Sequence, residues 1–102
     1  MDHFNVIIAA RAQSDRTECI LFLSRVSVEA AIELTHQMHE QIKSLELYPE
    51  RNPLFEMPKP FPYLVRKLLI NKRYLALYTI EDHNVVVYRI LDSRRKFDYL
   101  LK

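Results

Sequence analysis

Glycine is absent from this sequence of 102 residues, and cysteine occurs once. Without glycine, backbone positions with positive φ must be occupied by other residues, and asparagine and aspartate tolerate that conformation best. Asn71 and Asn84 lie where two hairpin turns are expected, so we assign them to such positions. The single Cys19 excludes an internal disulfide framework and favours a reducing, cytoplasmic location.

Long apolar runs are also absent. No stretch approaches the roughly 20 residues that a membrane span needs, so we expect no membrane partner. The first residues, MDHFNVII, have no basic segment and only a short apolar run, which argues against a secretory signal. With 49% hydrophobic and 27% charged residues, the composition is that of an ordinary soluble protein. We expect one domain, residues 1–102, with one core.

The familiar motifs of nucleotide binding, zinc hydrolysis and paired cysteines do not occur. His36 and His39 lie three residues apart on an expected helix, a spacing at which two side chains can share a metal ion. No third histidine or cysteine follows at ligand spacing, so we predict no metal and no cofactor. Cys19 falls on an apolar helix stripe, which favours a core side chain over a nucleophile.

The first half of the chain predicts one strand and two helices. Phe4 to Ala9 is a short apolar run typical of a strand, and residues 11–25 read as a helix with one apolar face. Ser27 is a good N-cap for a second helix that should end before Pro49. Its apolar residues recur at steps of three and four: Ala31, Leu34, Met38, Ile42 and Leu45. This stripe should pack on a sheet.

The second half predicts that sheet. Residues 63–70, 73–80 and 85–91 are rich in Leu, Ile, Val and Tyr, and polar breaks of two to four residues separate them. Breaks this short join antiparallel neighbours, so the three strands form a meander. Residues 49–62 contain all five prolines and should form a stiff connector.

Charge is unevenly distributed although the net charge is only +2. Residues 1–50 contain four Lys/Arg and eight Asp/Glu, whereas residues 66–96 contain eight Lys/Arg and three Asp/Glu. A basic sheet suits an anionic partner such as RNA, DNA or an acidic protein segment. Scattered, solvated lysines and arginines are the alternative interpretation.

One set of residues in the second half combines basic and aromatic positions with a Val-rich strand and a leucine-containing tail: Arg66, Tyr74, Tyr78, Asp82, Val85 to Val87, Ser93, Arg94, Arg95, Leu100 and Leu101. This set resembles the RelE/ParE superfamily of toxins from bacterial type II toxin–antitoxin pairs. The segment SVEAAIELTHQMHEQIKSLELYPERNP is similar to the front half of ParE-like toxins. The resemblance implies an α+β fold, in which an N-terminal strand and a helical hairpin pack on an antiparallel sheet of three to four strands, followed by a short C-terminal helix. It also implies a cognate antitoxin that neutralises the toxin in a hetero-oligomer.

Two branches of the superfamily imply different activities. RelE-type toxins are messenger-RNA endonucleases that act on the ribosome, and they need cations on the scissile phosphate and a group that moves protons. Position by position, Arg66 and Arg95 retain such cations, whereas Leu75 and Leu68 replace two others. Tyr99 lies two positions before the expected catalytic tyrosine. Arg66, Arg95 and Tyr99 are therefore the catalytic candidates of this alternative.

The tail SRRKFDYLL looks more like the ParE branch, which implies a non-enzymatic poison of DNA gyrase. The residues that we expect to bind the target or the antitoxin are Arg66, Lys67, Arg73, Arg89, Arg94, Arg95, Lys96 and Tyr99. A second alternative is an inactive family member that only binds the antitoxin. The tail alone also permits an amphipathic turn that packs Phe97, Leu100 and Leu101 on the sheet.

Overall fold

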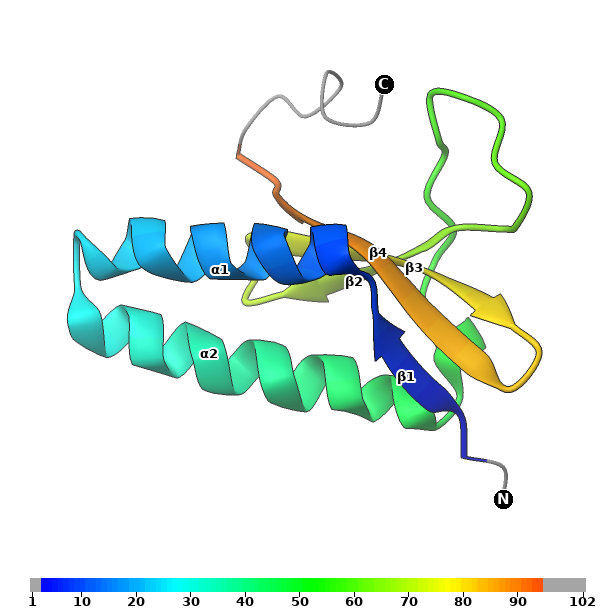
Figure 1. Ribbon diagram of the computed structural model, residues 1–102, viewed down its shortest axis with the longest axis horizontal. Helices are drawn as coiled ribbons and strands as arrows, with labels where there is room; N and C mark the ends of the chain where they lie inside the picture. Colours follow the sequence, from blue (N-terminus) through cyan, green and yellow to red (C-terminus); the bar gives the residue numbers. More distant parts are fainter. Residues whose placement is uncertain (1–2, 95–102) are drawn as a thin grey trace.

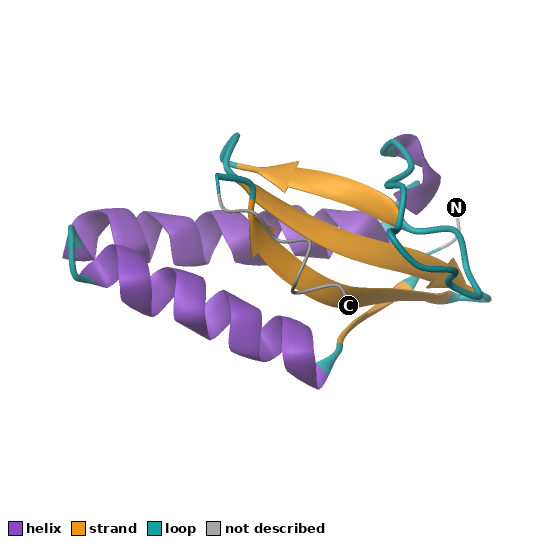
Figure 2. Ribbon diagram, turned by 90° about the horizontal axis from the view of Figure 1, so that it is seen from above, coloured by secondary structure: helices purple, strands orange, loops and turns teal. Residues whose placement is uncertain are grey.

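The computed structural model describes residues 3–94 and has two helices beside a four-stranded sheet (Figure 1). The elements in chain order are β1 (Asn5–Ile8), α1 (Ala10–Ser24), α2 (Val28–Lys43), the 3-10 turns η1 (Ser44–Glu46) and η2 (Pro49–Arg51), β2 (Arg66–Ile70), β3 (Tyr74–Glu81) and β4 (Asn84–Asp92). Both helices lie on one side of the sheet (Figure 2). The predicted α+β arrangement is confirmed, and the predicted C-terminal helix falls outside the described residues.

The strands are ordered β1-β4-β3-β2 in the sheet. β2, β3 and β4 are antiparallel neighbours, as the short breaks predicted. The first strand joins the same sheet, but it runs parallel to β4, so the sheet is mixed rather than purely antiparallel. A parallel pair needs a long connection, and the chain between β1 and β4, which includes both helices, supplies it.

Residues other than glycine occupy every position with positive φ. Asn71 and Lys72 adopt it between β2 and β3, which confirms the assignment of Asn71. The assignment of Asn84 is wrong, because Asn84 begins β4 and pairs with Glu81. Asp82 takes the positive φ of 58° instead. Aspartate tolerates this conformation nearly as well as asparagine, so the chain turns two residues earlier than predicted.

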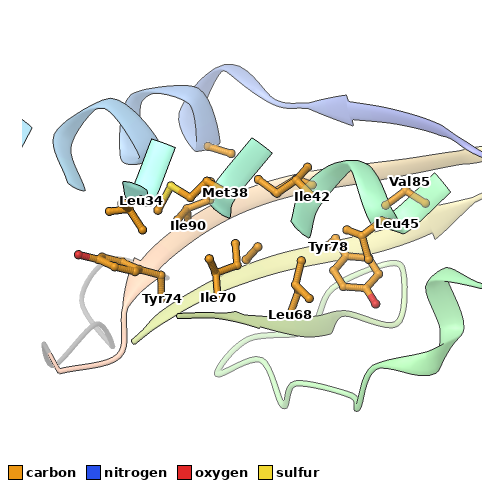
Figure 3. Packing of buried hydrophobic residues seen from close by; sticks show 13 residues of the cluster. Leu34, Met38, Ile42, Leu45, Leu68, Ile70, Tyr74, Tyr78, Val85 and Ile90 are labelled. Carbon is orange, nitrogen blue, oxygen red and sulfur yellow. The ribbon is translucent and has the colours of Figure 1, made fainter. Parts of the chain in front are cut away.

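α2 begins and packs as the sequence predicted. Ser27 caps it, since its Oγ accepts a hydrogen bond from the Ala30 N–H at 3.1 Å. All five stripe residues are buried, and Figure 3 shows four of them facing Ile70, Tyr74 and Tyr78 of the sheet. On α1, Ala12 is fully buried, and the other residues of its predicted apolar face pack against the same cluster: Cys19, Ile20 and Leu23.

A buried carboxylate on α1 replaces a strand at the edge of β4. β1 ends at Ile8, so within residues 3–94 the part of β4 beyond Val87 has no strand neighbour on that side. Asp15 Oδ2 accepts hydrogen bonds from the Ile90 N–H at 3.0 Å and from Arg89 Nε at 2.7 Å, and Arg89 Nη2 lies 3.1 Å from Asp15 Oδ1. Asp15 is only 7% exposed. It therefore satisfies a strand N–H and neutralises a shielded arginine.

We expect Asp15→Ala to lower the free energy of unfolding by about 3–5 kcal/mol, because it removes the carboxylate from a shielded guanidinium and the acceptor from a strand N–H. Arg11 is the matched control, since it lies 3.9 Å from the same carboxylate but its side chain is 64% exposed. Arg11→Ala should change stability by about 0.5 kcal/mol or less. Urea unfolding of both variants measures this, and equal losses would contradict the assignment.

Candidate functional site

The face of the sheet opposite the helices, here called the outer face, has an apolar centre. Leu77 and Leu91 are buried there together with Val65. Four further hydrophobic residues pack against them, three of them from the proline-rich connector: Phe55, Met57, Phe61 and Leu75. The connector therefore covers one face of the sheet as the helices cover the other.

This apolar centre includes a position where the nuclease branch would carry a cation. Leu75 lies on the outer face, half-buried among hydrocarbon side chains. Leu68, which stands at a second such position, points the other way and is buried against α2 (Figure 3). Neither side chain supplies a charge or a hydrogen-bond donor. Lys67 is adjacent and half-buried, at the rim of this face.

Arg66, a catalytic candidate, fastens the connector to the sheet. Its Nη1 donates a hydrogen bond to the Asn52 carbonyl at 2.7 Å. Nearby, the fully buried Tyr78 donates its hydroxyl to the Pro49 carbonyl at 2.5 Å and accepts from Asn52 Nδ2 at 3.0 Å. Burial raises the pKa of Tyr78, so the hydroxyl stays protonated at neutral pH.

Two of the expected binding cations are already paired with carboxylates. Arg73 donates to both oxygens of Asp92, at 2.9 Å from Nη2, and its guanidinium lies 5.2 Å from the centre of the Tyr74 ring. The hydrogen bond to Asp92 raises the pKa of Arg73 above its ordinary value. Arg89 is bound to Asp15, as described above. These two arginines are held in place rather than presented to a partner.

One further basic candidate, Arg94, follows the end of β4. Arg94 is exposed, and its backbone N–H donates to Asp92 Oδ1 at 3.0 Å, while Ser93 N–H donates to the Arg73 carbonyl at 2.7 Å. Arg95, Lys96 and Tyr99, which are also candidates, lie outside the described residues. The structure thus brings Arg73 and Arg94 together at one end of the sheet and places Arg66 at the connector.

A groove of about 290 Å³ lies beside this end of the sheet, between α1 and strands β3 and β4. Its lining includes Cys19, Phe22, Tyr74 and Leu91. Sequence reasoning missed this groove. The signal was the run Ile20 to Leu23, which is more apolar than one buried stripe requires and leaves Phe22 largely exposed.

Sequence reasoning also missed a hydroxyl–carboxylate cluster on the outer face. Glu81 Oε2 accepts from Thr79 Oγ1 at 2.5 Å and from the Tyr88 hydroxyl at 2.9 Å. The Phe61 ring meets the Tyr88 ring edge-on, with the ring centres 5.3 Å apart. Burial and the bond to Glu81 raise the pKa of Tyr88, which makes it a donor and not a base at neutral pH.

Metal ligands do not gather in residues 3–94: no group of three or more His, Cys, Asp or Glu side chains could hold an ion there. His36 and His39 are both exposed on α2. In the same part of the chain, no helix has the length and apolar character needed to cross a membrane.

Comparison with protein families matches residues 6–97 to the ParE toxin of the type II toxin–antitoxin system parDE. The chain belongs to the ParE toxin family. The match spans both helices and all four strands, and it confirms the resemblance seen in the sequence. A type II toxin is the function class that this ParE family membership supports.

A solved structure of the chromosomal ParDE TA system from P. aeruginosa is similar to this ParE-family chain. The TM-score is 0.67 at 19% sequence identity, and the alignment covers 88% of this chain and 96% of the other. At this identity the likeness shows the fold. No curated protein matches the chain.

We expect Tyr78→Phe to lower the free energy of unfolding by about 1–3 kcal/mol, since the Pro49 carbonyl and the Asn52 amide lose a buried partner. Tyr48→Phe is the matched control, because Tyr48 is largely exposed, and it should have little effect. The raised pKa of Tyr78 adds a pH signature. The unfolded chain ionises first, so stability should fall as pH rises above about 10.

This fall should be shallower in Tyr78→Phe, although not absent, because the pKa of Tyr88 is raised too. Thermal unfolding between neutral pH and pH about 11 measures both effects. An identical pH profile in the two proteins would contradict the role given to the Tyr78 hydroxyl.

Proposed function

We propose that the chain acts in the cytoplasm as a ParE-like inhibitor of DNA gyrase and that a cognate antitoxin neutralises it. Membership of the ParE family supports a toxin, and the apolar centre of the outer face is the observation that favours gyrase over RNA. The proposed contact residues are Arg94, at the end of the described part of the chain, and three residues that follow it in the sequence: Arg95, Lys96 and Tyr99. The mechanism is binding and needs no catalytic group, metal or cofactor.

The nuclease alternative requires positive charge where this chain has leucine. Loss of one donor to a developing anion typically costs 10²–10³ in rate, or about 2.7–4 kcal/mol. Leu75 and Leu68 would represent two such losses. Arg66, one of the two cations that remain, donates to the Asn52 carbonyl, so its orientation is set by the connector. Lys67 has a long side chain and would have to supply the positive charge that the two leucines lack.

An antitoxin of this proposal would bind with an acidic or amphipathic segment that folds on contact. The excess of Lys/Arg over Asp/Glu in residues 66–96 supports that chemistry. None of the ion pairs within residues 3–94 includes Lys67, Lys72 or Arg94, so these three cations are open to a partner's carboxylates. A reading frame beside this gene that encodes a small acidic DNA-binding protein would supply the antitoxin for testing.

We expect the purified protein to inhibit supercoiling of relaxed plasmid by DNA gyrase and the antitoxin to restore the activity. The double variant Arg94→Ala, Arg95→Ala should lose inhibition while its stability changes by about 0.5 kcal/mol or less, as is usual for substitutions away from packed side chains. Lys43→Ala, which removes an exposed cation at the end of α2, should inhibit as the wild type does.

Growth arrest without any effect on gyrase would contradict the gyrase target. A chain that binds the antitoxin but neither arrests growth nor affects gyrase would instead be the inactive, antitoxin-binding member of the family.

A further inference from the structure

β2 is an edge strand whose outer side is only partly paired. On the side away from β3, the Lys67 N–H donates to the Pro53 carbonyl at 3.0 Å and the Val65 carbonyl accepts from the Phe55 N–H at 2.7 Å. Backbone direction alternates along a strand, so the Lys67 carbonyl and both backbone groups of Leu69 point to this same side. Among the described residues, none of these three groups has a hydrogen-bond partner.

The space beside these groups is open. The connector pairs with this edge only from Pro53 to Phe55, opposite Lys67 to Val65, and a groove of about 430 Å³ follows the strand beyond Lys67. Its lining residues come from α2, the connector, β2 and β3: Gln41, Arg51, Asn52, Pro53, Lys67, Leu68, Leu69 and Leu75. Leu69 is 52% exposed, and β2 contains no proline that would block pairing. An unprotected edge of this kind is a template for another strand.

The two sides of the groove differ in chemistry. Leu69 and Leu75 lie on the outer face and are apolar, with Lys67 beside them. On the other side is Arg51, whose guanidinium donates to the Ser44 and Leu47 carbonyls at the end of α2. No carboxylate in residues 3–94 forms an ion pair with Arg51. Side chains of an added strand alternate between these two sides.

We propose that this edge of β2 binds an extended segment of a partner protein in which apolar residues alternate with acidic ones. Its backbone pairs with the Lys67 carbonyl and with Leu69. Its apolar side chains cover Leu69 and Leu75, and its carboxylates face Arg51. The site is carried by β2 itself, whereas naming the antitoxin as the source of the segment rests on the proposed function.

A second copy of this chain is a less suitable occupant. Pairing of one β2 with another would bring two sets of the same cations, Arg51, Lys67 and Lys72, to one edge. Like charges that face each other across strands are destabilising. Charge complementarity therefore favours an acidic partner strand.

Amide hydrogen exchange of the full chain, followed by NMR, measures directly whether the backbone amides of β2 are paired. In the free protein the Leu69 N–H should exchange quickly, and the Leu68 N–H, which points toward β3, should exchange slowly. A short synthetic peptide in which valine alternates with glutamate should slow exchange at Leu69 by about tenfold or more when saturating. The same peptide with lysine in place of glutamate should not do so.

Leu69→Pro removes the outward N–H and leaves the ladder with β3 intact, a substitution that edge strands tolerate. It should abolish binding of the glutamate peptide, whereas Leu69→Ala keeps the N–H and should retain weaker binding. Arg51→Glu provides a second variant, which leaves the backbone of β2 unchanged and reverses the charge that the carboxylates face. This variant should bind the glutamate peptide more weakly and should allow the lysine peptide to bind.

Unchanged exchange at Leu69 with millimolar glutamate peptide would overturn the proposal, and so would protection confined to other residues. Protection of Leu69 that grows with protein concentration alone would assign the edge to a second copy. The outcome of the gyrase assay does not depend on the outcome of this exchange experiment. Arg51→Glu should still inhibit gyrase but require more antitoxin for relief, so loss of the strand site and loss of the proposed function are distinguishable.

Discussion

β3 carries apolar side chains on both of its faces, and the rest of the structure is arranged to cover them. Ala76 and Tyr78 point toward the helices, while Leu75 and Leu77 point the other way. The stripe of α2 covers the first face, as it would in any layered α+β fold. The second face has no helix among the described residues and is covered by a connector rich in proline. Because such a segment has little regular hydrogen bonding of its own, it must be tied to the sheet.

The hydrogen bonds between the connector and the sheet determine which side chains the outer face can offer to a partner. Tyr78 and Arg66 hold the carbonyls of Pro49 and Asn52, and these bonds fix the start of the connector. Arg66, which would position a phosphate in a nuclease, therefore binds a backbone carbonyl here. Two more arginines, Arg73 and Arg89, are bound to carboxylates. The basic half of the chain is thus not one uncompensated patch. Among the described residues, Lys67, Lys72 and Arg94 form no ion pair, and they suit contact with a protein.

Local patterns in the sequence predicted local structure well. The cap at Ser27 and the stripe of α2 are encoded within a few turns of helix, so they could be read directly. The parallel pairing of β1 could not, because nothing near Asn5 to Ile8 specifies its neighbour. The link between Asp15 and Arg89 joins residues 74 positions apart, and neither residue carries a local sign of it. Counting charge found the arginines of the candidate site, but only the fold reveals which of them already have partners.

The central claim is that the outer face of this sheet serves contact and not cleavage. Translation in vitro of a defined message, with primer extension to map its ends, tests this most directly. The account predicts that the message stays intact when the protein is present, because Leu75 puts no charge on this face and Leu68 is buried against α2. Discrete cuts within ribosome-bound codons that disappear in Arg95→Ala would contradict it and would place the protein among the RNA-cleaving toxins.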